Sequence, residues 1–178
     1  MPKIIQDLPE KIMAQANAQL FAKGYSNMTM RSVAEACGIA VGTVYNYYKS
    51  KDVLVAQIML KDWNKIIEKI KRDCETSINI HEGFRVMYEG ISSFVDKYDP
   101  VWTQYGKEIS VRSEMPMQFD WLIKQLSEIL AEILLRCHNE KDDYIPVFLA
   151  EILINIAMKK DFEYENISRI LVRMFGNV

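Results

Sequence analysis

Residues 30–51 constrain the fold of this chain more than any other part of its sequence. They read as two short helices separated by Gly38 and followed by a long third helix. Val33, Ala34 and Cys37 recur at helical spacing, which predicts one apolar face on the first short helix. Glycine can end such a helix in the left-handed conformation without steric cost. We therefore predict two short helices that cross at a tight turn.

The second short helix is predicted over residues 41–47 and has two different faces. Ile39 lies in the turn as an apolar wedge, and Val44 lies on the inner face. This arrangement is typical of a helix-turn-helix, whose second helix enters the major groove of DNA. The outward face would carry Ala40, Gly42, Thr43, Tyr45, Asn46 and Tyr47.

The outward residue types suit contacts with DNA. Gly42 allows a close approach of the backbone, Thr43 can bond to a base or a phosphate, and Asn46 can pair with an adenine edge. The hydroxyls of Tyr45 and Tyr47 suit phosphate contacts. The alternative for these tyrosines is packing between helices. Their register with the glycine hinge and the apolar wedge favours DNA.

Residues 8–57 resemble the DNA-binding domain of the tetracycline-repressor (TetR) family of bacterial regulators. The matching run is Phe21-Ala-Lys-Gly-Tyr, followed by Thr29-Met-Arg-x-Val-Ala-x-x-Cys-Gly-Ile-Ala-Val-Gly-Thr-Val-Tyr-x-Tyr-Tyr-x-Ser-Lys. Many relatives carry Arg, Lys or Pro where this chain has Val41, so the base or phosphate contact that such a side chain could make is missing there. The resemblance implies DNA contacts by Thr29, Arg31, Ala40, Val41, Gly42, Thr43, Tyr45, Asn46, Tyr47 and Lys51.

The composition predicts an all-α protein in two parts. Apolar residues make up 49% of 178 residues, with only 7 glycines and 5 prolines, and they recur every three to four positions. The net charge is −2, but residues 1–60 hold six Lys and Arg against four acids. A mildly basic start suits an end that meets phosphates. We expect a helix-turn-helix domain at 1–50 and a helical effector-binding and dimerisation domain at 51–178, linked by the helix at 51–72.

About nine helices are predicted in total. Three start signals are capping patterns: Asp7 with Glu10, Ser50, and Asn79 with Glu82. The Asp99-Pro100 pair predicts a new helix, because proline fits a first turn. The predicted helices are 8–23, the two short helices, 51–72, 81–97, 99–111, 118–137, 144–159 and 163–176.

The last two predicted helices are candidates for a dimer interface. The helix at 144–159 is apolar around more than one face, which is typical of a helix central to a core or shared with a partner. The family resemblance implies that 144–159 and 163–176 pair with their copies as a four-helix bundle. The sequence alone leaves burial within a monomer nearly as favoured. A short recognition helix gains affinity from paired half-sites, which favours the homodimer.

The resemblance also implies a small-molecule effector held by the second domain. An aromatic cavity would suit a hydrophobic or cationic ligand. The alternative is that these aromatic residues only fill a core. The candidate lining residues are Trp63, Tyr88, Trp102, Tyr105, Phe119 and Trp121.

Other classes of function find little support. The three cysteines, Cys37, Cys74 and Cys137, are scattered, so we predict neither a disulfide nor a zinc site and expect a reducing cytoplasm. His81 and His138 have no spacing typical of catalysis. We therefore expect no enzyme activity, no catalytic residue, no metal and no cofactor. We also expect no signal peptide and no membrane span.

The sequence thus predicts a bacterial, ligand-responsive transcriptional regulator. It would most often act as a repressor that binds a palindromic double-stranded DNA operator as a homodimer and is released by an effector. The alternative keeps the fold and changes the role, giving a helical module that senses a ligand or partner with weak or no specific DNA binding.

Overall fold

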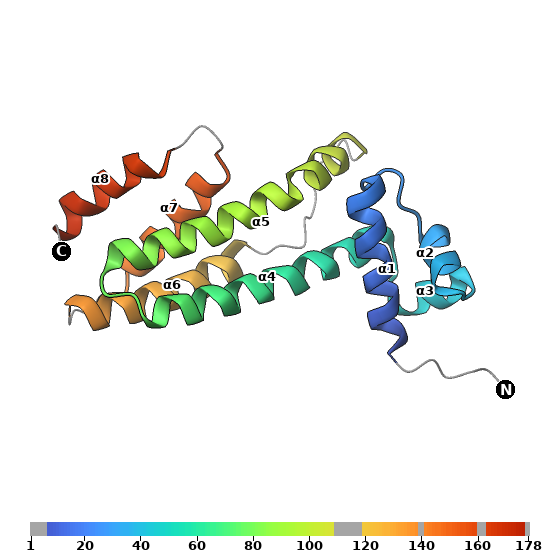
Figure 1. Cartoon of the computed structure of the whole chain (residues 1–178), viewed down its shortest axis with the longest axis horizontal. Helices are drawn as coiled ribbons and strands as arrows, with labels where there is room; N and C mark the ends of the chain where they lie inside the picture. The colour runs from blue at the N-terminus through green and yellow to red at the C-terminus, as the bar shows by residue number, and fades with distance from the viewer. Residues whose placement is uncertain (1–6, 109–118, 139–140, 160–162, 177–178) are drawn as a thin grey trace. The chain divides into compact units, whose positions relative to one another are not determined.

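Every regular element among the described residues is an α-helix, which confirms the predicted all-α class (Figure 1). The structure, a computed structural model, describes residues 7–108, 119–138, 141–159 and 163–176. Most helix ends lie within three residues of the predicted ones. The helices are α1 (Leu8–Lys23), α2 (Met30–Cys37), α3 (Val41–Tyr47), α4 (Lys51–Glu75), α5 (Ile80–Glu108), α6 (Phe119–His138), α7 (Ile145–Ala157) and α8 (Tyr164–Phe175).

The chain forms two compact units, and two helices contribute to both. The first unit comprises Met1–Asp62 and Tyr98–Pro116, and the second comprises Trp63–Lys97 and Met117–Val178, as far as these residues are described. The first unit therefore contains α1 to α3, the start of α4 and the end of α5. These are compact bodies rather than functional domains, so the functional division between residues 50 and 51 stays a prediction.

The predicted new helix at Asp99-Pro100 is wrong, because α5 runs through Pro100 without ending. Proline removes one helical hydrogen bond and crowds the preceding turn. Tyr98 and Val101, on either side of it, are both buried in the first unit. Burial of these flanking side chains offsets the cost of the proline. The predicted residues 109–111 of that helix lie outside the described residues.

The predicted capping patterns differ in outcome. Asp7 has a φ of 61° and its side chain caps nothing, so the proposed pairing with Glu10 is wrong. Ser50 accepts a bond from the N–H of Val53 at 3.2 Å, as expected. Asn79 Oδ1 accepts the N–H of Glu82 at 2.9 Å, which confirms the cap of α5.

The first unit has a core in which α5 takes part. The ring of Phe21 in α1 meets Tyr98 edge to face at 5.5 Å between centroids. Tyr98 is fully buried, and its hydroxyl donates to Asp62 Oδ2 at 2.8 Å. The predicted apolar stripe of α1 is buried throughout and consists of Leu8, Ile12, Ala16 and Leu20.

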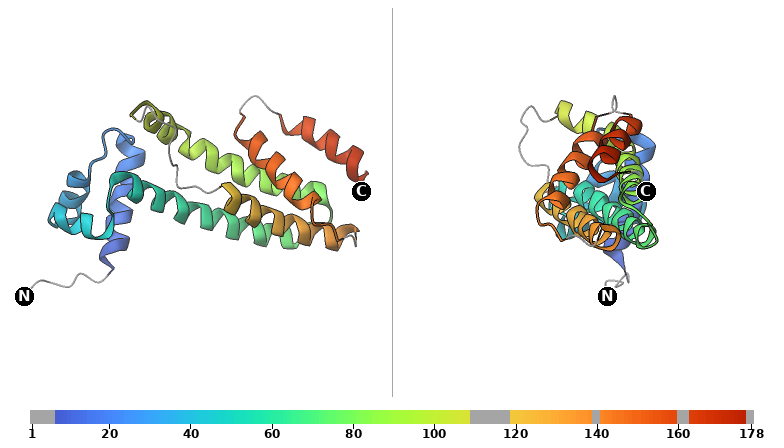
Figure 2. Two further views of the ribbon diagram at one scale, coloured as in Figure 1. Left: turned by 180° about the vertical axis from the view of Figure 1, so that it is seen from behind. Right: turned by 90° about the vertical axis from the view of Figure 1, so that its left-hand side faces the viewer.

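The second unit is a helical bundle in which α6 and α7 lie side by side (Figures 1 and 2). Trp63 packs edge to face on Phe94 at 5.3 Å, and its indole N–H donates to Gln125 Oε1 at 2.8 Å. Gly90 brings α5 close to α4, since a Cβ there would lie 2.8 Å from Cδ1 of Ile70. Trp63 thus acts as a packing group with a satisfied polar atom.

Replacing Tyr98 with Phe should lower the free energy of unfolding by about 2 kcal/mol at pH 7, because the variant has no hydroxyl to bind the half-buried Asp62 carboxylate. Burial raises the pKa of Tyr98, and the Asp62 carboxylate raises it further. The folded parent therefore keeps a proton that the unfolded chain releases above about pH 10, and its stability falls there. The difference in free energy of unfolding between the parent and Tyr98→Phe should therefore become smaller from pH 7 to pH 10.5. Urea titrations at the two pH values measure it.

The matched control is Tyr144→Phe, whose parent side chain is 84% exposed. This variant should unfold with the parent's free energy to within about 0.5 kcal/mol. A Tyr98→Phe variant as stable as the parent at pH 7 would contradict the assigned bond.

Candidate DNA-binding surface

The turn between α2 and α3 has the predicted geometry. Gly38 adopts a φ of 69°, in the left-handed region that favours glycine, and ends α2. Its N–H donates to the carbonyl of Glu35 at 3.0 Å, and the N–H of Ile39 donates to the carbonyl of Ala34 at 3.0 Å. The chain therefore reverses direction with these backbone groups satisfied.

The inner faces of α2 and α3 are buried as expected. Val44 is fully buried and is the buried residue of α3, while Ile39 in the turn is half-buried. Lys11 of α1 donates from Nζ to the carbonyl of Cys37 at 2.9 Å. Burial raises the pKa of the Cys37 thiol. Cys37 therefore behaves as a small core residue rather than a reactive thiolate.

The structure leaves most of the predicted DNA-contacting residues of α3 exposed. Tyr45 is 45% exposed, Tyr47 is 48% exposed and Val41 is 36% exposed. Thr43 is half-buried. The backbone at Gly42 is open, with nothing within 4 Å of an added Cβ. Ala40 and Asn46 are also exposed.

The start of α2 presents a second part of the predicted surface. Thr29 accepts the N–H of Ser32 at 3.0 Å, and the Ser32 hydroxyl faces the N–H of Thr29 at 3.2 Å. This reciprocal capping box was not predicted, although a hydroxyl three positions after Thr29 was a usable signal. Arg31 follows it and is exposed. The DNA contacts of Thr29 and Arg31 stay predictions.

Lys51 lies at the start of α4 and is oriented by the loop after α1. Its Nζ donates to the carbonyl of Tyr25 at 3.1 Å and lies 3.8 Å from the centroid of the Tyr25 ring. The Tyr25 hydroxyl donates to Asp52. Sequence reasoning missed Tyr25 and Asp52 because their contact spans 27 positions. The phosphate contact of Lys51 stays a prediction.

The candidate effector residues do not all belong to one compact unit. Trp102 and Tyr105 line a small apolar pocket of about 30 Å³ in the first unit, beside Val55 and Met59. Trp63 lies in the core of the second unit and is only 2% exposed. Tyr88 and Trp121 are half-buried in the second unit. The side chain of Phe119 lies outside the described part.

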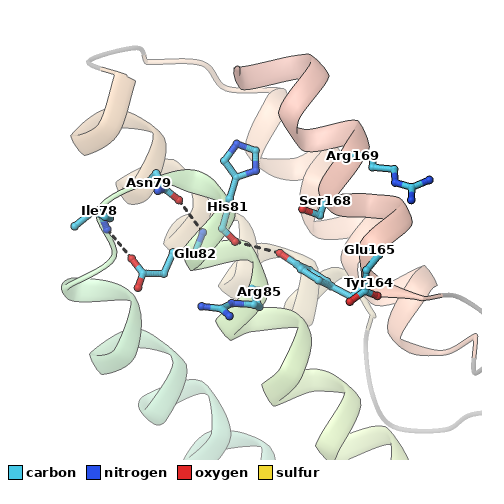
Figure 3. A pocket seen from close by; sticks show the side chains of 9 residues that line it. All are labelled: Ile78, Asn79, His81, Glu82, Arg85, Tyr164, Glu165, Ser168 and Arg169. Carbon is cyan, nitrogen blue, oxygen red and sulfur yellow. Dashed lines mark hydrogen bonds between the residues drawn. The ribbon is translucent and has the colours of Figure 1, made fainter. Parts of the chain in front are cut away.

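A larger and more polar pocket was missed by sequence reasoning. The pocket lies between the start of α5 and α8 and has a volume of about 710 Å³. The side chain of Tyr164 points from α8 toward α5 (Figure 3). The Tyr164 hydroxyl donates to the carbonyl of His81 at 3.1 Å, and burial raises its pKa to about 12. Two acidic residues, Glu82 and Glu165, and two basic residues, Arg85 and Arg169, line the pocket. The lining residues are Ile78, Asn79, His81, Glu82, Arg85, Tyr164, Glu165, Ser168 and Arg169.

The described residues contain no group of three or more His, Cys, Asp or Glu that could hold a metal ion. Of the helices that the structure describes, none combines the length and the apolarity needed to span a bilayer.

Replacing Gly38 with Ala should destabilise the protein by about 1 kcal/mol, because an L side chain is disfavoured in the left-handed region. An added Cβ meets nothing within 4 Å at Gly38 or at Gly42. Gly42→Ala is therefore a matched control, and it should stabilise the free protein by about 0.5 kcal/mol through helix propensity. Urea unfolding measures both changes. Equal changes at the two positions would contradict the role of the hinge.

Sequence comparisons place the start of the chain among known regulators. The model of the family described as bacterial regulatory proteins, tetR family, matches residues 12–58. A helix-turn-helix-type transcriptional regulator of Haemophilus influenzae is 25% identical over 91 residues, which cover 51% of this chain and 49% of the relative. A regulator of Mycobacterium tuberculosis is 33% identical over 76 residues, covering 43% and 33%. The matched part thus spans less than half the length of these curated relatives.

Solved structures share the fold over almost the whole chain. The TetR-family repressor AlkX from a Dietzia strain has a TM-score of 0.61 at 16% identity, covering 96% of this chain and 94% of its own. FadR of Thermus thermophilus, a TetR-family repressor solved with lauroyl-CoA, has a TM-score of 0.60 at 17% identity, covering 96% and 95%. Residues 12–58 are thus similar to the tetR family of bacterial regulatory proteins, and the chain shares the fold of solved TetR-family repressors.

Proposed function

We propose that this protein is a repressor that binds a palindromic DNA operator as a homodimer and releases it when a small hydrophobic or cationic effector binds. The observation that carries the proposal is the division of α3 into one buried residue and an outward polar surface. Val44 anchors the helix, while Tyr45, Asn46 and Tyr47 are exposed. A short helix held in this way can enter the major groove.

We assign base recognition to the middle of α3. Asn46 carries both a donor and an acceptor, which match the edge of adenine in the major groove. Gly42 leaves room for the backbone to approach the bases, since nothing lies within 4 Å of its missing Cβ. Thr43 is half-buried beside them and offers a hydroxyl.

We assign phosphate contacts to residues at the end of α3 and on the neighbouring helices. The exposed hydroxyls of Tyr45 and Tyr47 can donate to phosphate oxygens. Arg31 and Lys51 add positive charge on either side. These contacts fix the position of the protein on DNA without reading its sequence.

Homodimerisation is supported by an apolar surface on α7 and α8. Phe148 is 52% exposed and Ile170 is 51% exposed, although both are large apolar residues. Large apolar residues that remain exposed on a helix are candidates for burial in an interface. A two-fold dimer would place two copies of α3 about 34–36 Å apart, the spacing of successive major grooves. The other exposed apolar residues of α7 and α8 are Val147 and Met174.

An apolar effector is supported by the solved relatives and by the aromatic residues. FadR of Thermus thermophilus was solved with lauroyl-CoA, and SmeT was solved with triclosan. Trp102 and Tyr105 line an apolar pocket of about 30 Å³ next to Asp52, at the start of α4, which would have to widen to admit such a ligand. A ligand releases DNA only if it binds a second conformation better than the DNA-binding one. We assign α4 as the connection that carries this change.

Selection of binding sites from random DNA by the purified protein tests the proposal directly. A palindromic motif with half-sites about one helical turn apart is the expected result. Affinity for the selected site should fall steeply as salt rises. Failure to retain any duplex at low salt would favour the sensing module without DNA binding.

Asn46→Ala and Lys51→Ala should weaken DNA binding in different ways. Removing the Asn46 amide should relax base preference at one position of each half-site, at a cost of about 1–3 kcal/mol. Removing the Lys51 amine should weaken binding to all sequences and lower the salt slope by about one for each phosphate that is no longer neutralised. Fluorescence anisotropy on variant operators, repeated across salt concentrations, separates the loss of base preference from the loss of a phosphate contact. An Asn46→Ala variant with the parent's base preferences would refute its role.

Phe148→Glu should disrupt the homodimer, because it places a charge in the apolar surface of α7. We expect the dimer dissociation constant to rise at least about 100-fold, since burying an unpaired charge costs about 3 kcal/mol or more. Sedimentation velocity measures it. Leu60→Glu is the matched control, because Leu60 is 38% exposed on α4. Equal effects of the two variants would contradict this interface.

A further inference from the structure

The end of α5 holds the loop between α1 and α2 through two consecutive residues. The Oε1 atom of Gln104 accepts the backbone N–H of Ser26 at 3.1 Å. The ring of Tyr105 meets Tyr25 edge to face, with 5.4 Å between centroids. All four residues belong to the first unit, and Figures 1 and 2 show this end of α5 beside the end of α1.

Gly24 makes the approach of Gln104 possible. A Cβ on Gly24 would lie 2.7 Å from Oε1 and 2.8 Å from Nε2 of Gln104, closer than real contacts allow. The φ of Gly24 is 79°, which also favours glycine. The backbone of the loop thus leaves space where the amide of Gln104 lies.

The same loop leads directly to the proposed DNA-binding surface. The carbonyl of Tyr25 orients Lys51, and the hydroxyl of Tyr25 binds Asp52. Three residues after Ser26, Thr29 caps the start of α2. A displacement of this loop therefore moves both the cap of α2 and the Lys51 amine.

We propose that Gln104 is a positioning residue for DNA binding, although it lies on α5 and outside the helix-turn-helix. It acts by holding the backbone of Ser26, and so sets where α2 and Lys51 meet the phosphates. This inference rests on the proposed DNA-binding function. With this role, α5 joins the proposed DNA-binding surface to the second unit, in addition to α4. Residues 80–97 of α5 belong to the second unit.

The experiment compares Gln104→Met with Gln104→Glu in the full-length protein. Methionine keeps the length of the side chain but offers only a weak acceptor, whereas the carboxylate of glutamate accepts the Ser26 N–H. The readouts are amide hydrogen exchange at Ser26, affinity for the selected operator, and the melting temperature. Operator affinity is measured across salt concentrations and compared by extrapolation to 1 M salt, which removes the effect of the added charge in the glutamate variant.

We expect Gln104→Met to speed exchange at Ser26 by about 3–10-fold and to weaken operator binding by a similar factor, which matches the loss of one hydrogen bond. Its melting temperature should stay within about 2 °C of the parent, because the bond lies at the surface. Gln104→Glu should keep the slow exchange and the extrapolated affinity of the parent.

Parent-like exchange and affinity in Gln104→Met would overturn the inference. Weakened binding with unchanged exchange at Ser26 would overturn it too, because the effect would then not pass through the loop. If the parent itself binds no duplex, the proposed function fails, and the positioning role fails with it. That result differs from the others because it appears before any variant is made.

Discussion

The burial of Val44 on α3, which packs against α2 across the turn at Gly38, is the constraint on which the proposed DNA-binding surface depends. A helix of seven residues is too short to be stable by itself, so its orientation comes from tertiary contacts. Val44 is fully buried, and most of its neighbours on α3 are exposed. A single anchored residue thus sets the direction of a whole polar surface. The left-handed glycine permits the tight turn that brings this anchor to the inner face of α2.

The local parts of this arrangement could be predicted from the sequence, because they depend on neighbouring residues. The Gly38 turn, the apolar stripe of α1 and the cap at Asn79 each follow from residues a few positions apart, and the structure has them all. The assignment of DNA contacts rests on the same short segment and stays a prediction. The helix start at Pro100 was predicted wrongly, because local preference yielded to the burial of distant side chains.

Long-range contacts account for what the sequence did not reveal. Tyr25 contacts Asp52 and Tyr105, which lie 27 and 80 positions away, and no periodic pattern marks such pairs. The aromatic residues pose the same problem for an effector site. Trp63 has the residue type of a ligand contact, yet its indole is satisfied by Gln125 within a packed core. Residue type alone does not separate a packing group from a binding group.

In the proposed function, dimerisation and DNA recognition would be linked by a simple limit on affinity. One short helix makes few base contacts, and each good contact contributes about 1–3 kcal/mol of discrimination. Two copies on one duplex double these contacts, and the entropic cost of association arises only once if the copies are already joined. The exposed apolar residues of α7 and α8 would then serve recognition as directly as Asn46 does. In the proposed homodimer, an effector would not need to touch α3 to release DNA, since a change in the spacing of the two copies would be sufficient.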